Sequence, residues 1–278
     1  MLKSINLTHG SLFSGIGGFD LAANWSGIPT RWQVEKDPYC RYVLSQHFPE
    51  TELFEDVTQV GKAQLKPVSI ISGGFPCQPF SVAGKRKGKK DNRFLWPQML
   101  RIISELKPNY VIGENVPGII SLALDQVLDS LKKEGYYTES FILPACGIGA
   151  WHKRERVWII AYRKDRFNTS SIKEQNRYWK LIEKQIESTL NFDDLDIEKE
   201  NSDKIPTWES AQFSDGIIPS LWQSEPQINR VTTKTYQRIN RIKGLGNAIV
   251  PQMAYLIFKS IIEIETQIQE LKNHNSKV

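Results

Sequence analysis

The chain has 278 residues, of which 40% are hydrophobic, 24% charged and 10% aromatic, and its formal net charge is +5. This length suits one large α/β domain or a large domain with a smaller one, and the composition excludes a disordered or fibrous protein. No apolar run approaches the roughly 20 residues of a membrane span, and the N-terminus lacks the apolar stretch of a signal peptide, so we expect a cytoplasmic protein.

Between residues 8 and 162, short apolar runs alternate with amphipathic stretches, which is typical of βαβ units in a mostly parallel, doubly wound sheet. The expected strands span residues 8–13, 30–34, 68–72, 110–113, 141–143 and 157–161, with a further short one at Leu53 and Phe54. The expected helices include residues 38–46, 94–106 and 122–133. In such a sheet the first strand leads into the cofactor site.

A glycine-rich turn joins the first expected strand to a helix and contains Phe13, Ser14, Gly15 and Gly17. Glycines permit positive φ and let a ligand approach the backbone without a Cβ in the way. The turn is not the dinucleotide fingerprint GxGxxG, because Asp20 stands where the last glycine is needed. By itself the turn fits either a cofactor site or a tight turn without a ligand.

Acidic residues follow the next two strands. Glu35 ends the second strand and Asp56 follows the third. A carboxylate at this place can accept hydrogen bonds from the ribose hydroxyls of a nucleoside cofactor. Each acid alone is typical of a solvated surface carboxylate. The glycine turn and the two acids, in order at successive strand ends, favour a nucleoside cofactor.

A cysteine lies in a stiff turn after the strand at 68–72. The turn contains Pro76, Cys77, Gln78 and Pro79, and it lies at the carboxyl edge of the expected sheet. The chain has three cysteines, too few and too scattered for a disulfide framework, and no cysteine or histidine near Cys77 could share a metal with it. We therefore predict a nucleophile. A buried small cysteine in a loop is the alternative.

Charged residues reach the same edge from two later strands. Glu114 follows the strand at 110–113, where it can face Cys77 across a pocket. Such a pair suits a nucleophile that attacks an unsaturated ring while an acid hydrogen-bonds the ring nitrogen. Arg154 and Arg156 precede the last expected strand, and strand alternation predicts them on one face, where they could bind phosphate or ring carbonyl oxygens. The alternatives are a carboxylate at a helix N-terminus and a solvated, salt-bridged edge.

Basic residues are concentrated after the Cys77 turn. They are Lys85, Arg86, Lys87, Lys89, Lys90 and Arg93. A flexible basic loop beside a reactive thiol suits a lid that closes over a phosphodiester backbone. Because most basic runs are simply solvated, this loop supports a nucleic-acid substrate without establishing one.

The composition changes after residue 163. Residues 165–204 are mostly charged and amide side chains, residues 205–229 look irregular, residues 230–246 are basic, and a final helix pattern covers 251–271. We expect a separate module or insertion at 165–229 between a catalytic domain at 1–164 and a C-terminal segment at 230–278.

The motifs, in this order, resemble those of the DNA (cytosine-5)-methyltransferases of bacteria and phages. Residues 12–19 are similar to the first S-adenosylmethionine motif, and residues 74–81 resemble the catalytic loop. Residues 114–116 match the Glu-Asn-Val motif, residues 153–156 the motif with two arginines, and residues 245–252 the last motif. The resemblance implies a doubly wound, Rossmann-like methyltransferase sheet with a small target-recognition domain at 165–229.

The resemblance also implies roles for particular residues. S-adenosylmethionine would be bound by Phe13, Ser14, Gly15, Gly17, Glu35, Asp56, Pro76 and Asn247. Catalysis on a flipped cytosine would use Cys77, Glu114, Arg154 and Arg156. The six basic residues of the loop at 85–93 would contact DNA phosphates, and no metal is required.

The resemblance implies double-stranded DNA as the partner, no membrane, and a monomer. It also allows a cognate restriction endonuclease that acts on the same site, in a bacterial cell or a phage-infected host. A tRNA cytosine methyltransferase shares the thiol chemistry, but such relatives typically have proline in place of Phe75. A catalytically inactive DNA-binding homologue is a further alternative, against which the intact Pro-Cys-Gln and Glu-Asn-Val segments speak.

Overall fold

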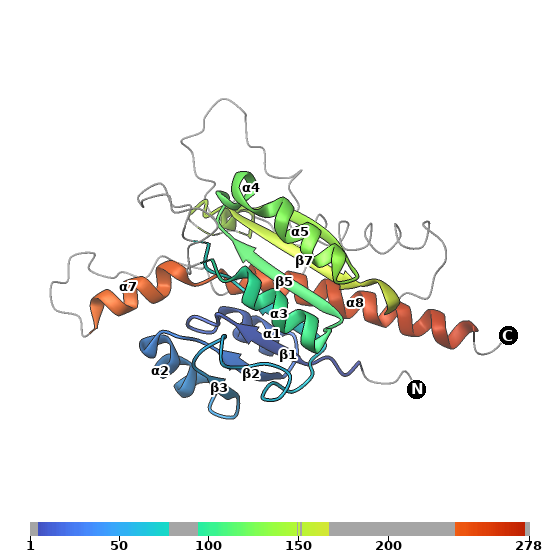
Figure 1. The fold of residues 1–278 in the computed structure, drawn as a ribbon, viewed down its shortest axis with the longest axis horizontal. Coiled ribbons are helices and arrows are strands. Elements are labelled where there is room, and N and C mark those ends of the chain that lie inside the picture. Colours follow the sequence, from blue (N-terminus) through green and yellow to red (C-terminus); the bar gives the residue numbers. More distant parts are fainter. Residues whose placement is uncertain (1–4, 78–93, 149, 151, 167–236, 276–278) are drawn as a thin grey trace.

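In the computed structural model, the described residues are 5–77, 94–148, 150, 152–166 and 237–275 (Figure 1). The expectations for the basic loop at 85–93, and those for nearly all of the recognition region at 165–229, lie outside this part of the chain. The described residues form the sheet, the helices on both of its faces and the two C-terminal helices.

Seven strands of the described residues form one sheet in the order β3-β2-β1-β4-β5-β7-β6. They are β1 (His9–Leu12), β2 (Thr30–Val34), β3 (Glu52–Phe54), β4 (Ile70–Gly73), β5 (Tyr110–Asn115), β6 (Tyr136–Leu143) and β7 (Arg156–Arg163). Neighbours are parallel from β3 to β5, whereas β7 runs antiparallel to both β5 and β6. The expected doubly wound, mostly parallel sheet is confirmed, and its strand order reverses between β1 and β4, where such sheets bind ligands.

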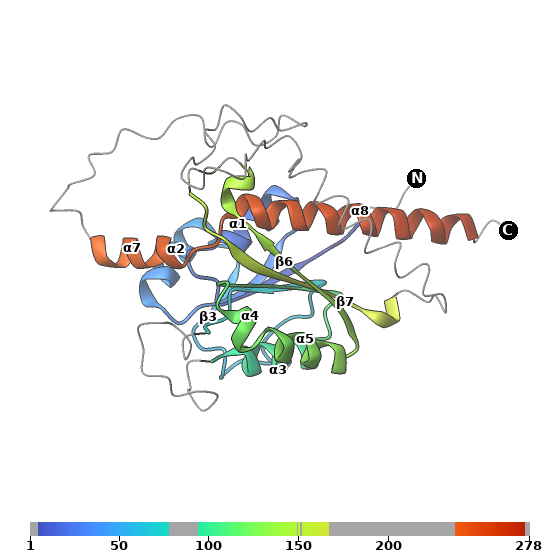
Figure 2. The ribbon, with the colours of Figure 1, turned by 90° about the horizontal axis from the view of Figure 1, so that it is seen from above.

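Helices cover both faces of the sheet (Figure 2). They are α1 (Gly18–Trp25), α2 (Pro38–His47), α3 (Trp96–Leu106), α4 (Ile119–Leu122), α5 (Leu124–Lys133), α7 (Arg238–Asn247) and α8 (Pro251–Asn275). One apolar core joins α1 and α8 to the sheet, and a second joins α3 and α5 to its other face. The long C-terminal helix therefore returns to the first strand and the first helix of the chain.

Local sequence explains how these layers pack. In α3 the buried residues Trp96, Met99, Ile102 and Ile103 recur at helical spacing and so form one apolar face. In β1, a Cβ at Gly10 would lie 2.2 Å from the indole of Trp32, which is buried on the neighbouring strand. Only glycine leaves room for that indole.

Two expected elements differ from the structure. The helix expected at 122–133 is α5, which begins two residues later at Leu124, because Ala123 adopts φ −154° and Leu122 is the last residue of α4. The strand expected at 141–143 is β6, which already begins at Tyr136. It is an edge strand whose interior residues Thr138, Glu139 and Ser140 are not buried, so its start carries no apolar pattern.

One helical stretch, Arg238–Glu270, is long and apolar enough by length and composition to cross a membrane, contrary to the sequence-based expectation. Half of its apolar window is buried inside the molecule, as in the core helix of a soluble protein, which passes the same test. Within α8 the buried residues Met253, Ile257, Ile261 and Ile264 belong to the core on the α1 face of the sheet. The apolar character of this helix is therefore explained by packing against the sheet.

Candidate active site

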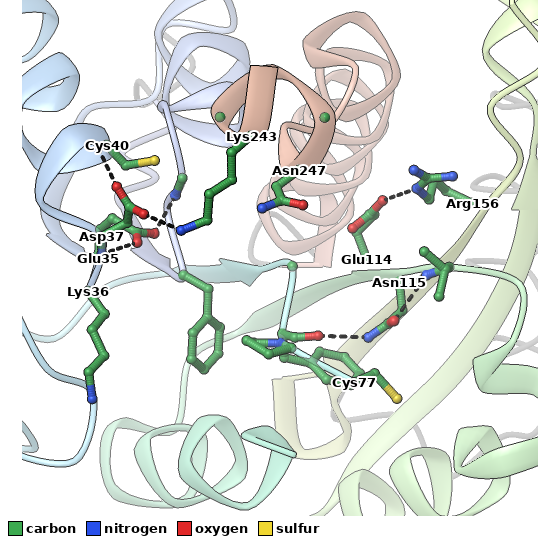
Figure 3. Close-up of a pocket in the computed structure, with 18 of the residues that line it drawn as sticks. Glu35, Lys36, Asp37, Cys40, Cys77, Glu114, Asn115, Arg156, Lys243 and Asn247 are labelled. Atoms are coloured by element: carbon green, nitrogen blue, oxygen red, sulfur yellow. Dashed lines mark hydrogen bonds and ion pairs between the residues drawn. The ribbon is translucent and has the colours of Figure 1, made fainter. Parts of the chain in front are cut away.

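A cavity of about 590 Å³ lies at the carboxyl ends of the central strands (Figure 3). The predicted site residues that line it are Phe13, Gly15, Glu35, Pro76, Cys77, Glu114, Arg154, Arg156 and Asn247. Glu35 follows β2, Cys77 follows β4 and Glu114 lies in β5, so parallel strands bring these side chains to one edge of the sheet. This volume is within the usual range for small-molecule sites.

Glu35 forms the wall of one end of the cavity. Its Oε2 accepts a hydrogen bond from the backbone N–H of Gly15 at 2.7 Å, and its Oε1 accepts one from the N–H of Asp37 at 2.7 Å. Gly15 has φ +56°, and nothing lies within 4 Å of the place where a Cβ would be. The carboxylate is thus held in a fixed orientation beside an open stretch of backbone.

Two other residues of the glycine turn do not line the cavity. Ser14 is buried and its hydroxyl donates to the carbonyl oxygens of Ser11 at 3.1 Å and Val34 at 3.4 Å, which ties the turn to β1 and β2. Gly17 has φ +90°, and a Cβ there would lie 2.6 Å from the ring of Phe48. Both residues therefore shape the turn without lining the cavity.

Asp56 does not line the cavity either. Its Oδ1 accepts hydrogen bonds from the backbone N–H of Thr58 at 2.9 Å and the Thr58 hydroxyl at 2.8 Å, and its Oδ2 pairs with Lys36 at 3.2 Å. These bonds hold the pKa of Asp56 below its usual range, with the backbone bond from Thr58 the largest cause. Asp56 is therefore linked to the cavity only through its ion pair with Lys36, which does line it.

The opposite end of the cavity holds the predicted nucleophile. The Asn115 side chain, at the end of β5, donates to the carbonyl oxygen of Phe75 at 2.9 Å and so fixes the backbone that leads to Cys77. On the other side, Cys77 forms an isolated β-bridge with Phe94. Burial raises the pKa of the Cys77 thiol to about 11, so the thiol is protonated at neutral pH.

Glu114 lies beside this backbone and pairs with an arginine. Arg156 Nε is 3.0 Å from Glu114 Oε1, and a Cβ at Gly74 would come within 3.2 Å of Glu114 Oε2. Burial raises the pKa of Glu114 to about 7, while the charges of Arg156 and Arg154 oppose this rise. The carboxyl can therefore carry a proton near neutral pH, which allows it to donate a hydrogen bond as well as accept one.

The two arginines do not follow strand alternation, so that expectation is wrong. β7 begins at Arg156, and Arg154 has φ +33°, in the left-handed region outside the strand. Arg154 Nη2 donates to the carbonyl oxygen of Gly246 at 3.0 Å and also to that of Ala248. Both arginines line the cavity, but Arg156 faces Glu114 and Arg154 faces the end of α7.

Sequence reasoning missed several residues of the site. Lys243 on α7 pairs with Asp37 at 2.6 Å, and both line the cavity together with Asn240. Lys243 and Asn247 are four residues apart on one helix, so they share a face, which a helix prediction for this stretch would have indicated. The sequence does not favour such a prediction, because Gly244 and Gly246 both have low helix propensity.

The donor set fits a nucleoside cofactor. The Glu35 carboxylate, fixed at the end of β2, can accept hydrogen bonds from two ribose hydroxyls. Gly15 leaves room for a ligand against the backbone. Polar side chains of α7 complete that end of the cavity, whereas the thiol and the Glu114–Arg156 pair lie at the other end. Among the described residues, no group of three or more histidine, cysteine, aspartate or glutamate side chains could hold a metal ion.

The family model for C-5 cytosine-specific DNA methylases matches residues 7–231. The chain belongs to this family. A cytosine methylase relative, the Type II methyltransferase M.HhaI of Haemophilus parahaemolyticus, is 36% identical over 159 residues, which cover 55% of this chain and 48% of that protein. Type II methyltransferase M.AquIA of Picosynechococcus is 35% identical over 175 residues, 55% of this chain and 71% of that protein. The chain thus spans about half the length of M.HhaI.

Solved structures of related proteins share the fold of this chain. One of a Spodoptera frugiperda DNMT2 mutant matches with a TM-score of 0.50 and 26% identity, over 60% of this chain and 52% of that chain. One of a prophage-encoded DNA modification methyltransferase of E. coli matches with a TM-score of 0.50 and 27% identity, over 59% and 49%. The resemblance to bacterial and phage cytosine methyltransferases is therefore confirmed. The family match ends before α7 and α8, so the placement of Lys243 and Asn247 rests on the structure.

Proposed function

We propose that this chain transfers a methyl group from S-adenosylmethionine to carbon 5 of cytosine in duplex DNA through a covalent adduct with Cys77. One observation carries the proposal: Cys77 and the Glu114–Arg156 pair line one end of a cavity whose other end holds Glu35 beside Gly15. A reactive base and a nucleoside cofactor could meet between these two ends. Membership of the cytosine methylase family supports the same chemistry.

The cytosine must leave the duplex before carbon 5 can be reached, at an unstacking cost of a few kcal/mol. The Cys77 thiolate then adds to carbon 6, and the electron pair of the ring double bond moves toward carbon 5. Glu114, with its proton, donates to ring nitrogen 3 and accepts from the exocyclic amine, which stabilises the electron-rich ring. Arg156, already paired with Glu114, is well situated to bind the ring oxygen.

When bound, S-adenosylmethionine supplies an electrophilic methyl group on a sulfonium. After methylation, which would release the cofactor's thioether, a solvent-borne base would take the proton from carbon 5, and elimination of the Cys77 thiolate would restore the ring double bond and the enzyme. Glu35 would bind the ribose hydroxyls, Gly15 would let the cofactor approach the backbone, and Asn247 would contribute from α7. Because the Cys77 thiol has its pKa raised to about 11, it must lose its proton within the DNA complex.

DNA recognition is proposed for the parts of the chain outside the described residues. The basic loop at 85–93 would contact phosphates, which carry no sequence information, and the segment at 165–229 would read base edges. Relatives include Type II methyltransferases and an orphan methyltransferase of Bacillus phage rho11s. We further propose that the chain acts as a cytoplasmic monomer. The Type II names of relatives support a restriction endonuclease of the same specificity as its partner.

Tritium transfer from labelled S-adenosylmethionine tests the proposal. We expect label in duplex DNA and none in tRNA, and no transfer by Cys77→Ser, whereas Cys146→Ser should remain active because Cys146 does not line the cavity. DNA containing 5-fluorocytosine should trap the wild-type chain as a covalent adduct. Elimination of Cys77 requires loss of a proton from carbon 5, and a base cannot remove fluorine from that carbon in the same way. Label in tRNA alone would assign an RNA substrate, and appreciable turnover by Cys77→Ser would remove the covalent step.

A further inference from the structure

Helix α7 lies over the cavity and is fixed on both sides of it. Lys243 and Asn247 point from α7 into the cavity, with Asp37 on one side and the Glu114–Arg156 pair on the other (Figure 3). The helix approaches the glycine turn closely as well, since a Cβ at Gly244 would lie 3.1 Å from Ile16. A ligand in the cavity would therefore have α7 as part of its enclosure.

The first attachment is an ion pair. Lys243 Nζ lies 2.6 Å from Asp37 Oδ2, and these two residues are 206 positions apart in the chain. Asp37 is itself fixed, because its Oδ1 caps α2 by accepting from the N–H groups of Tyr39 and Cys40. Its backbone N–H donates to Glu35, so the pair joins α7 to the loop that orients the proposed ribose carboxylate.

The second attachment is Arg154. Its guanidinium donates to the carbonyl oxygens of Gly246 and Ala248, which flank Asn247 at the end of α7. These oxygens carry the partial negative charge of a helix C-terminus, so a guanidinium is a favourable partner. Arg156, two residues later, makes no such contact and instead pairs with Glu114. The two arginines of this motif thus contact different parts of the site: Arg154 contacts the end of α7, and Arg156 contacts Glu114.

We infer that Arg154 and Lys243 are positioning residues for the cofactor, which act by holding α7 and Asn247 over the cavity, and that Arg154 does not serve the target base. This inference rests on the proposed function, because it concerns the S-adenosylmethionine end of the same site. If α7 detaches part of the time, the apparent dissociation constant rises by the reciprocal of the attached fraction. Neither residue needs to touch the cofactor for this effect.

Cofactor binding without DNA separates the two arginines, since a residue that contacts only the base cannot act when no base is present. We expect Arg154→Met to weaken S-adenosylmethionine binding by about tenfold or more in calorimetry, and Arg156→Met to change it less than about twofold. Arg154→Lys, which keeps a charged donor, should restore part of the affinity. The thermal midpoint of each ligand-free variant reports any general loss of stability.

A double-mutant cycle tests the ion pair. Asp37→Asn keeps the acceptor that caps α2 but removes the charge, and Lys243→Met removes the partner. If the pair acts as a unit, each variant and the combined variant should lose about the same affinity, and KM for the cofactor should rise with little change in kcat. Arg241→Met, on an exposed part of α7 outside the cavity, is the matched control and should bind as the wild type does.

The outcomes separate this inference from the function on which it rests. A wild-type chain that does not bind S-adenosylmethionine would overturn the proposed function. A wild-type chain that binds it, with unchanged affinity in Arg154→Met and a loss confined to kcat on DNA, would assign Arg154 to the base and overturn the inference. Additive losses in the cycle would show that Lys243 acts on the cofactor independently of Asp37.

Discussion

Arg156 Nε lies 3.0 Å from Glu114 Oε1, and these side chains are only 20% and 10% exposed. Burial nevertheless raises the pKa of Glu114 to about 7, because desolvation of the carboxylate outweighs the favourable charge of the arginine. An acid that titrates near neutral pH suits proton exchange with a ring nitrogen. The pair therefore has a predictable effect on the pH dependence of the reaction.

The rate of methyl transfer should level off near pH 7. Below that pH the Cys77 thiolate increases about tenfold per pH unit while Glu114 stays protonated, so kcat/KM should rise. Above about pH 7 the loss of the Glu114 proton offsets the gain in thiolate. Glu114→Gln, whose amide does not titrate, should be about 100- to 10,000-fold slower at pH 7, and its kcat/KM should continue to rise at higher pH.

Glu155→Gln is the control for this profile. Glu155 pairs with Lys153 at 3.1 Å and does not line the cavity, so its replacement should leave the break near pH 7 in place. A Glu114→Gln profile that still levels off near pH 7 would assign the break to another group.

Glu35→Gln should weaken S-adenosylmethionine binding by about 10- to 150-fold, because it removes a charge-assisted hydrogen bond to the ribose. The glutamine keeps one acceptor for the N–H of Gly15 or Asp37, so the turn should stay folded. Calorimetry with and without DNA measures the effect, and DNA affinity without cofactor should not change. Glu55→Gln, an exposed neighbour outside the cavity, is the control, and equal cofactor affinity in both variants would place Glu35 outside the binding site.

Asp20 should make folding stability depend on pH. It is fully buried on α1, and neither carboxylate oxygen has a hydrogen-bond partner among the described residues. Burial raises the pKa of Asp20 from 3.8 to about 6, and the nearby Gln33 and Ser11 side chains oppose the rise. Ionisation of Asp20 in the folded chain therefore lowers the free energy of unfolding. This loss is absent below pH 3.8, grows up to about pH 6, and stays constant above that pH, at roughly 3 kcal/mol.

Asp20→Asn should therefore stabilise the chain by about 1–3 kcal/mol at pH 7.5 and have little such advantage at pH 4. Denaturant unfolding at both pH values measures the difference. Asp129→Asn, at an exposed position on α5, should show no comparable pH dependence. A stability difference for Asp20→Asn that is the same at both pH values would mean that the pKa of Asp20 is not raised in the folded chain.

Replacing Lys89 and Lys90 by alanine should weaken binding to specific and unrelated duplexes alike. Each lost phosphate contact should lower the slope of log K against log salt concentration by about 0.9. The control replaces Lys132 and Lys133, exposed on α5, which changes the net charge equally. Loss of affinity for the specific duplex alone would instead indicate that the loop reads bases.

The sequence by itself determined the sheet and the approximate membership of the site. Apolar runs in alternation with amphipathic stretches indicated parallel strands, and the chemistry-bearing residues Glu35, Cys77 and Glu114 each stood at or just after the end of one such run. Because the carboxyl ends of parallel strands meet at one edge of a sheet, that order along the chain was enough to predict that the three side chains share a cavity.

Only the tertiary structure decided how the charged groups are paired. Arg154 and Arg156 belong to one short motif, yet Arg154, whose own backbone is left-handed, contacts α7, whereas Arg156 faces Glu114. Lys243 meets Asp37 across 206 positions of the chain, and no local spacing relates these two residues to each other. Periodicity records which face of an element is buried, whereas the partner on that face depends on how distant elements pack, and that information is not present in any local stretch of sequence.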